Sequence, residues 1–207
     1  MTLAAQEHAL LRPLLLYAAL WMSFAIGHSV LASRPTRRLV IALVGASERL
    51  MFNTVAIVHL TIVLAAGHAL FANAPGFDLP PFVRVDLAGL QVCGAIGLVV
   101  VLRSYDLGRF GGLTQWRTRA PDSLVAPDGA LVTAGLHAYV RHPLYTASIV
   151  LLLGGATSPF GLATAAFGTA YLVVGLRFEE RKLLAVYGAP YQRYRERVPA
   201  LLPIRLL

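Results

Sequence analysis

The chain has 207 residues, of which 57% are hydrophobic and 14% are charged, about half the charged share of an ordinary soluble domain. This composition excludes a typical soluble domain and predicts an all-α integral membrane protein with a single membrane domain over residues 1–207. The net charge of +8 does not indicate a nucleic-acid partner, because the basic residues lie between apolar segments, where they orient membrane helices.

Five apolar runs are predicted to form transmembrane helices. They lie at residues 14–31, 50–70, 82–102, 143–157 and 162–177. A helix that crosses the hydrocarbon core needs roughly 20 residues, which the first three runs supply and the last two do not. An uncharged turn joins the last two, so we predict a short helical hairpin. Its second arm is expected to continue past Arg177 into water.

The basic residues predict how these helices are oriented. Of the 18 Lys and Arg residues, all but Arg12 and Arg84 lie in three segments. These are the segment between the first and second runs, the segment between the third and fourth runs, and the segment after the fifth run. Such segments share one side of the membrane when there are five spans. Because cytoplasmic segments are enriched in Lys and Arg, the N-terminus is predicted outside and the C-terminus in the cytoplasm.

Small residues predict close helix packing. Gly89, Cys93 and Gly97 recur every four residues in the third apolar run. This spacing places them on one face of a helix, where small side chains let a neighbouring backbone approach. We therefore expect this face to contact another membrane helix.

The stretch "YVRHPLYTASIVLLLGG", residues 139–155, places Arg141, His142 and Pro143 at the edge of an apolar run. Proline suits the first position of a helix, which would make His142 the N-cap. The free N–H groups of that first turn attract an anion or the polar edge of a ligand. An ordinary helix start with an interfacial arginine is the alternative.

Two adjacent carboxylates, Glu179 and Glu180, lie within a turn of the last apolar run. Carboxylates at a membrane edge cost solvation free energy unless they are partnered. Either they pair locally with Arg177, Arg181 or Lys182, or one of them turns inward to hold a cation or ribose hydroxyls.

Aromatic and histidine side chains leave further alternatives open. Tyr187, Tyr191 and Tyr194 could form an aromatic belt or the wall of a pocket, and the intervening Pro190 argues against one continuous helix. His28 and His59 could together ligate a haem. The chain lacks the short-range histidine and cysteine spacings of metal sites, however, and we predict no metal.

Combined, these motifs resemble a family of membrane methyltransferases. "LVTAGLHAYVRHPLYTASIVLLLGG" (131–155) and "EERKLLAVYGAPYQRYRERVP" (179–199) are similar to the C-terminal half of isoprenylcysteine carboxyl methyltransferase and the phospholipid N-methyltransferases. "GHSVLASRPTRR" (27–38) and "ERLMFNTVAIVHLT" (48–61) resemble NnrU-type proteins. "YDLGRFGGLTQ" (105–115) resembles bacterial methanethiol S-methyltransferase.

The resemblance implies S-adenosylmethionine as cofactor, bound at the cytoplasmic ends of the last helices. It divides the chain into a three-helix scaffold, 1–102, and a second half, 103–207, with the cofactor-binding loop, the hairpin and a cytoplasmic C-terminal segment. Carried over by position, the implied cofactor-binding residues are Leu131, Val132, His137, His142, Pro143, Leu144, Tyr145, Glu179 and Glu180. Arg141 and Glu180 are the expected catalytic residues. Gln115, Trp116, Arg177, Tyr187 and Tyr191 are expected to face the methyl acceptor.

The expected activity is methyl transfer to a small thiol, such as methanethiol, or to a lipophilic acceptor from the membrane lipid. His137 stands where the isoprenylcysteine enzymes have tyrosine, and Gly175 stands where they have arginine, which argues against a prenylated carboxylate. The alternatives are a phospholipid or isoprenylcysteine methyltransferase and a non-catalytic NnrU-like accessory protein of nitrogen-oxide metabolism. A bacterial inner membrane is the expected location, and the sequence does not determine an oligomeric state.

Overall fold

A computed structural model describes residues 3–120 and 131–202, which are predominantly helical and contain no strand over these ranges. The α-helices are α1 (Leu3–Ala32), α2 (Arg34–Val44), α3 (Glu48–Leu70), α4 (Pro81–Leu102), α5 (Leu107–Gly111), α6 (Leu113–Thr118), α7 (Pro143–Gly154), α8 (Pro159–Tyr187) and α9 (Ala189–Arg197). Two short 3₁₀ helices, η1 (Gly45–Ser47) and η2 (Gly135–Ala138), precede α3 and α7. The predicted all-α class is confirmed.

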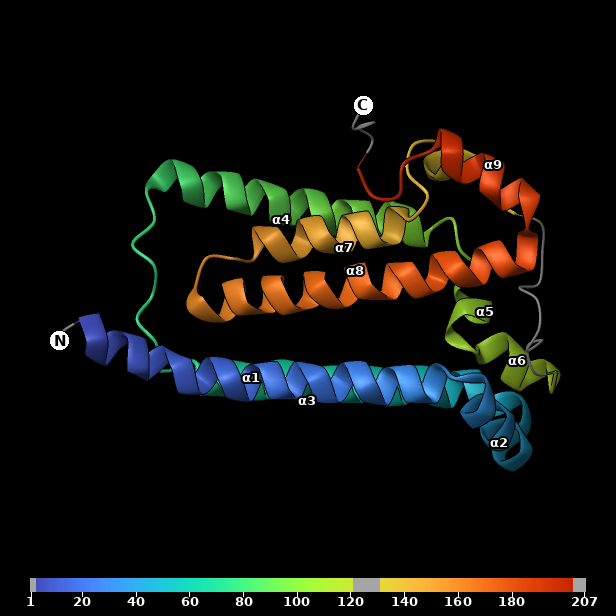
Figure 1. Cartoon of the computed structure of the whole chain (residues 1–207), viewed down its shortest axis with the longest axis horizontal. Helices are drawn as coiled ribbons and strands as arrows, with labels where there is room; N and C mark the ends of the chain where they lie inside the picture. The colour runs from blue at the N-terminus through green and yellow to red at the C-terminus, as the bar shows by residue number, and fades with distance from the viewer. Residues whose placement is uncertain (1–2, 121–130, 203–207) are drawn as a thin grey trace.

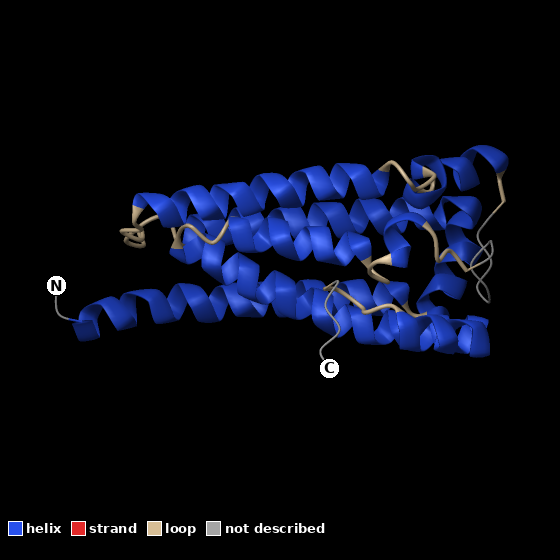
Figure 2. Cartoon of the chain, turned by 90° about the horizontal axis from the view of Figure 1, so that it is seen from above, coloured by secondary structure: helices blue, strands red, loops and turns tan. Residues whose placement is uncertain are grey.

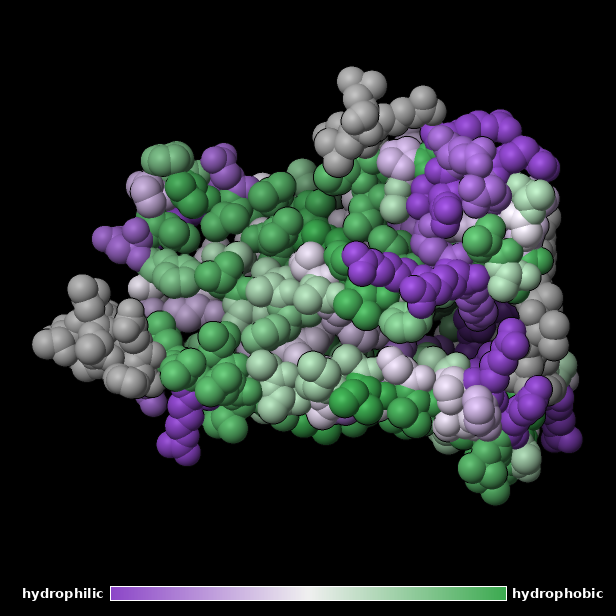
Figure 3. Space-filling model, viewed as in Figure 1, coloured by the Kyte–Doolittle hydropathy of each residue, from purple (hydrophilic) through white to green (hydrophobic). Residues whose placement is uncertain are grey.

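The helices α1, α3, α4, α7 and α8 run side by side, while α2, α5, α6 and α9 gather at one end (Figure 1). Figure 2 shows the same layered bundle after a turn of 90°. Hydrophilic residues concentrate at the end that carries α5, α6 and α9, and apolar residues cover the middle of the bundle (Figure 3). We call the first of these the polar end; it is the end that the distribution of Lys and Arg predicts to be cytoplasmic.

Four helical segments are long and apolar enough to cross a membrane: Leu10–Ala32, Arg34–Leu70, Pro81–Leu102 and Pro159–Tyr187. The second arm of the predicted hairpin is therefore not short, and it does continue past Arg177. The first arm, α7, has only 12 residues and is about 18 Å long, well under the roughly 30 Å of a hydrocarbon core. A fifth span and the orientation of the termini stay predictions.

The tightest helix pair is α4 with α7, and glycines make it possible. A Cβ on Gly94 would lie 2.3 Å from the backbone N of Leu151, and one on Gly154 would lie 2.2 Å from the backbone N of Gln91. The predicted face is only partly right. Gly97 does face Ala147, but Gly89 has open space around it in the described part, and Cys93 is exposed. The contact is centred on Gly94, which lies about 100° around the helix from Cys93.

Aromatic side chains join the two halves of the chain. Tyr17 and Trp21 of α1 are buried with Val63 of α3 and Ala163 of α8. The hydroxyl of Tyr17 is 2.8 Å from that of Thr164 on α8. This core fixes α8 against the α1–α3 pair and so sets the relative positions of the side chains at the polar end.

Candidate functional site

A buried carboxylate organises the polar end. Three donors converge on Glu180 Oε1: Arg141 Nε at 2.8 Å, the Tyr191 hydroxyl at 2.9 Å and His142 Nε2 at 2.8 Å. The side chains of Glu180 and Arg141 are 13% and 9% exposed, so water does little to solvate either charge. We call Arg141, His142, Glu180 and Tyr191 the Glu180 cluster. It brings together residues from the start of α7, from α8 and from α9.

The Glu180 cluster decides between the two interpretations of the adjacent carboxylates. The partner of Glu180 comes from 39 residues earlier in the chain and is Arg141, not one of the nearby cations. Arg181 instead lies over the ring of Phe178 at 5.9 Å. A charge-assisted hydrogen bond at this depth is stronger than one between neutral groups. Local surface pairing of Glu180 was therefore the wrong alternative.

The segment after α9 closes over the cluster. The backbone N–H groups of Arg141 and His142 donate to the carbonyls of Pro199 and Ala200, at 2.9 and 3.1 Å. Arg141 Nη1 donates to the carbonyls of Arg195 and Val198. The two backbone bonds hold the chain at residues 141–142, and the two bonds from Nη1 hold the guanidinium beside Glu180.

Tyr191 is a permanent donor in this arrangement. Burial, together with the hydrogen bond to the Glu180 carboxylate, raises the pKa of Tyr191 above its ordinary value. The hydroxyl thus keeps its proton throughout the neutral range. Tyr191 and Tyr194 are buried at the polar end, and Tyr194 donates to the carbonyl of His137 at 2.6 Å. These two tyrosines therefore pack inside the protein and do not form an aromatic belt on its surface. The predicted break between Tyr187 and Tyr191 is confirmed, because α8 ends at Tyr187 and Gly188 has a φ of +58°.

The second carboxylate, Glu179, lies on another side of α8 and keeps an accessible face. Its Oε2 is 3.9 Å from His142 Nδ1, and its side chain is 43% exposed. The hydroxyl of Tyr145 forms a hydrogen bond with it. Burial, and then the Glu179 charge, raise the pKa of Tyr105. Glu179 is thus available to a ligand in a way that Glu180 is not.

The start of α7 lies beside Glu179. As predicted, Pro143 occupies the first turn and His142 is the N-cap, although the His142 side chain makes no capping hydrogen bond within the described residues. The ring of His142 instead stacks on that of Tyr145, with centroids 5.6 Å apart and planes 14° apart. The first-turn N–H groups of α7 therefore have no side-chain cap, as suits an anion-binding helix start.

The remaining predicted site residues lie outside the Glu180 cluster. Val132, Trp116 and Arg177 are exposed, while Leu131, Leu144 and Tyr187 are half-buried. Gln115 is buried and its Nε2 donates to the carbonyl of Arg109 at 2.9 Å, which holds the corner between α5 and α6. His137 supports the site from behind, with Nδ1 3.1 Å from the carbonyl of Arg141.

A second polar site forms where the front-half motifs meet α8. Arg37 of α2 pairs with the buried Glu48 through two bonds, Nε to Oε1 at 2.8 Å and Nη2 to Oε2 at 3.0 Å. Beside this pair lies a pocket of about 190 Å³. It is lined by Ala32, Arg37, Glu48, Arg49, Phe52, Asn53 and Lys182. We call it the front pocket, and it is the place where the front half and α8 share a polar surface.

The corner between α5 and α6 is bonded to α3 beside the front pocket. Asn53 Nδ2 donates to the carbonyls of Phe110 and Gly111, at 3.0 and 3.1 Å. Gly112 has a φ of +92°, and a Cβ there would lie 2.4 Å from the backbone N of Leu50. Gly112 of the 105–115 motif is thus required both by its backbone conformation and by its close approach to α3.

Sequence reasoning missed Tyr171, and it named Lys182 only as a possible local partner of the two adjacent carboxylates. Tyr171 of α8 interacts electrostatically with the Tyr145 hydroxyl, and Lys182 brings α8 to the front pocket. Tyr171 lies eight residues before Glu179 and Lys182 lies three residues after it. Both spacings place a residue on the same side of a helix, and this was the available signal.

Two other features bear on the expectations. Over the described ranges no three His, Cys, Asp or Glu side chains gather as metal ligands, and His28 and His59 lie against the same ring of Phe24, at 5.6 and 5.5 Å.

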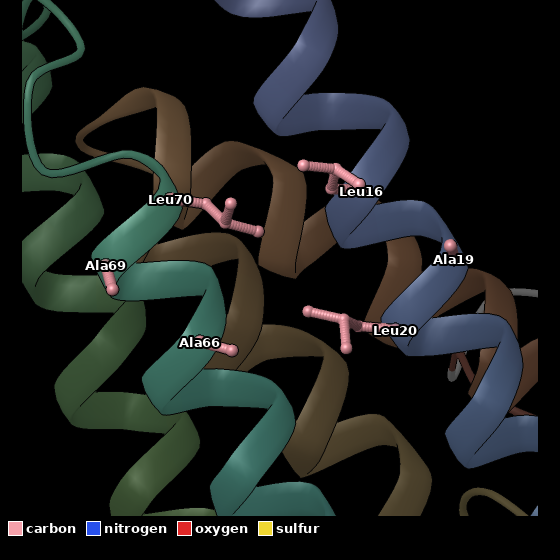
Figure 4. Close-up of a pocket in the computed structure, with 6 residues that line it drawn as sticks. All are labelled: Leu16, Ala19, Leu20, Ala66, Ala69 and Leu70. Carbon is pink, nitrogen blue, oxygen red and sulfur yellow. The ribbon is translucent and has the colours of Figure 1, made fainter.

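An apolar hollow of about 570 Å³ opens between α1 and α3, where Leu16 and Leu20 face Ala66 and Leu70 (Figure 4). Aliphatic side chains offer no catalytic group, so we assign no chemistry to this hollow.

Comparison with known proteins supports the resemblance to membrane methyltransferases. The chain is 28% identical over 208 residues to methanethiol S-methyltransferase of Crocosphaera subtropica, a match that covers 95% of this chain and 77% of that relative. Over 69 residues it is 45% identical to methanethiol S-methyltransferase 2 of Bradyrhizobium diazoefficiens, covering 33% of this chain and 27% of the relative.

A third relative is protein-S-isoprenylcysteine O-methyltransferase of Schizosaccharomyces pombe, 34% identical over 85 residues that cover 37% of this chain and 34% of the relative. The second and third matches thus span about a third of each chain. No family model and no solved structure matches. The relatives confirm the suspected family resemblance and support a membrane methyltransferase.

Proposed function

We propose that this chain, a relative of the methanethiol S-methyltransferases, is an integral membrane methyltransferase that uses S-adenosylmethionine and methylates a small thiol. One observation carries the proposal: an accessible carboxylate, Glu179, lies 3.9 Å from His142 at the uncapped start of α7. The Glu180 cluster fixes both elements behind it. A rigid, partly open polar corner at the edge of apolar helices suits a charged cofactor and an apolar acceptor.

The residues present fit the cofactor. The free N–H groups at the start of α7 suit the carboxylate of its methionine part, and Glu179 suits its ribose hydroxyls or its amine. Aromatic rings attract a sulfonium as they attract other cations, and Tyr145 and Tyr105 lie next to Glu179. When bound, S-adenosylmethionine supplies an electrophilic methyl group; the chain's own residues bind it, orient it and exclude water.

The two carboxylates take different roles in this proposal. Glu180 and Arg141 saturate each other and are buried, so they position the start of α7 and do not react. Glu179 is the carboxylate that meets the cofactor. His142 links the two, because one ring nitrogen bonds to Glu180 and the other faces Glu179. The second half of the chain, 103–207, thus supplies the cofactor site, and 1–102 supplies the opposite wall.

The thiol acceptor and the orientation rest on separate arguments. The basic residues at the polar end point that end to the cytoplasm, and we place the protein in a bacterial inner membrane with its site on that face. A relative whose match covers 95% of this chain is named for methanethiol, so a small thiol is preferred to a phospholipid amine or a prenylated carboxylate. A non-catalytic accessory role is the competing function, and cofactor binding separates the two.

The test is calorimetric titration of S-adenosylmethionine and S-adenosylhomocysteine into the detergent-purified protein. We expect binding by the wild type and a loss of about 10- to 100-fold in affinity for Glu179→Gln, because a hydrogen bond to a charged group contributes about 1.5–3 kcal/mol. Glu196→Gln is the matched control, since Glu196 is an exposed carboxylate that contacts Gln192. A folded wild type that binds neither compound would favour the accessory role.

A further inference from the structure

The front-half motif that contains His28 lies against the candidate cofactor site. The imidazole of His28 contacts rings from three helices: Phe24 of α1 at 5.6 Å, Phe52 of α3 at 4.9 Å and Tyr171 of α8 at 6.0 Å. Its Nδ1 is buried and has no hydrogen-bond partner among the residues described. A buried polar atom without a partner costs free energy, which is a reason to look for a ligand that satisfies it.

The surroundings of His28 connect the two polar sites. On one side, Tyr171 interacts electrostatically with Tyr145, whose hydroxyl bonds to Glu179. On the other side, Phe52 lines the front pocket. His28 thus lies between the proposed cofactor site and a polar route to the polar end of the bundle. Figure 3 shows the surface hollowed at this end, between the α8 side and the α1–α3 side.

Both histidines of α3 are placed differently. His59 Nε2 is 3.2 Å from the Ser23 hydroxyl, so this ring is already engaged by a polar neighbour. His68 packs on Phe160 at 5.5 Å, near the end of α3 that is farthest from the Glu180 cluster. His28 alone combines a buried unpartnered nitrogen with contacts that lead to Glu179, within the ranges described.

We propose that His28 is the base that takes the proton of the acceptor thiol, an inference that rests on the proposed function. The thiolate, not the thiol, is the nucleophile. The S–H bond breaks and its proton moves to Nδ1 of the neutral imidazole, leaving the electron pair on sulfur. That pair forms the new bond to the methyl carbon of the sulfonium donor, whose own carbon–sulfur bond breaks with its pair kept by the departing thioether. The imidazolium then releases the proton to water through the front pocket.

Charged and titratable groups on the neighbouring helices lie near His28 or line the front pocket, where they can influence the proton transfer. Tyr171 faces it from α8, and His59 lies across Phe24 on α3. The front pocket adds Glu48 and Arg49 of α3, Arg37 of α2 and Lys182 of α8. Aromatic rings from α1, α3 and α8 contact the imidazole, and the front pocket gives the released proton a polar route to water.

The first test needs no methyl transfer. A small alkyl thiol is added to the protein saturated with S-adenosylhomocysteine, and thiolate formation is followed by its ultraviolet absorbance at neutral pH. We expect a thiolate signal in the wild type and in the control His68→Gln, and none in His28→Gln. Retained S-adenosylhomocysteine binding shows that the His28→Gln site is intact; if that variant loses binding, His28→Asn takes its place in the same measurements.

The second test is the pH profile of kcat/KM for the thiol. In the wild type the profile should rise and level off within the range in which imidazoles titrate, about pH 5 to 8. In His28→Gln it should be about 10²- to 10⁴-fold lower at neutral pH, the usual contribution of a general base, and should keep rising as the free thiol ionises. Added imidazole should restore activity to His28→Ala.

The outcomes separate the two proposals. A wild-type thiolate signal and an unchanged pH profile in His28→Gln, with S-adenosylhomocysteine still bound, would overturn the role of His28 alone. A wild type that binds no S-adenosylhomocysteine would overturn the proposed function, and the role of His28 with it.

Discussion

Glu180→Gln should lower the free energy of unfolding by about 3–5 kcal/mol, the usual cost of removing one partner from a buried ion pair. The substitution keeps the size of the side chain but leaves Arg141, which is 9% exposed, opposite a neutral amide. It also weakens the bonds from His142 and Tyr191 that end on the same oxygen. Denaturation in detergent, followed by circular dichroism, measures the loss.

Glu179→Gln is the matched control, because it makes the same chemical change one residue away on a carboxylate that is 43% exposed. Its effect on stability should stay within about 0.5 kcal/mol, while its effect on cofactor affinity should be large. A double-mutant cycle with Arg141→Gln adds a check, since residues in one network should show a coupling of about 0.5–3 kcal/mol. Equal stability losses for the two glutamates would show that the Glu180 cluster does not hold the polar end together.

Gly94→Ala should destabilise the protein by about 1–3 kcal/mol, the range for overpacking a tight interface. The added Cβ would lie 2.3 Å from the backbone N of Leu151, and a backbone atom cannot move aside as a flexible side chain can. To accept the methyl group, α7 must shift away from α4, and the start of α7 carries His142. We therefore expect weaker S-adenosylhomocysteine binding as well as a lower melting temperature.

Gly89→Ala, in the same helix, provides the opposite expectation. A Cβ at Gly89 meets nothing within 4 Å among the described residues, so the change removes only the conformational freedom of glycine. Alanine in a helix interior is more stable than glycine by roughly 0.5–1 kcal/mol. A stability change of the same sign and size in both variants would contradict the close approach of α4 and α7.

Local chemistry explains which elements could be predicted. Pro143 begins α7, and Gly188 separates α8 from α9, because proline and glycine act on their own backbone whatever the tertiary contacts. The bonds from Arg141 and His142 to Glu180 could not be predicted, since they depend on how the start of α7 packs on α8. The same limit applies to Gly94. The spacing of Gly89, Cys93 and Gly97 predicted one small-residue face, whereas the position of α7 makes Gly94 the point of closest approach.

Another element escaped prediction for a different reason. The helix α2 has no buried residue, and Leu39 and Leu43 are 62% and 75% exposed. It lies between the first two predicted spans, and its own apolar run is too short to cross a membrane. Ser33 and Pro35 at its start were the local signals of a helix there, and in the structure the backbone N–H of Thr36 donates to the Ser33 hydroxyl oxygen. The folded chain shows that this helix places Arg37 against Glu48.

The bonds between residues 141–142 and the segment after α9 determine when the polar end can assemble during synthesis. The backbone N–H groups of Arg141 and His142, and Nη1 of Arg141, donate to carbonyls at 195–200. Those residues leave the ribosome more than fifty residues after Arg141 does. The membrane helices are complete before that, so a nascent chain holds a formed bundle with an unformed polar end. The corner that we assign to the cofactor is therefore the last part of the described chain to assemble.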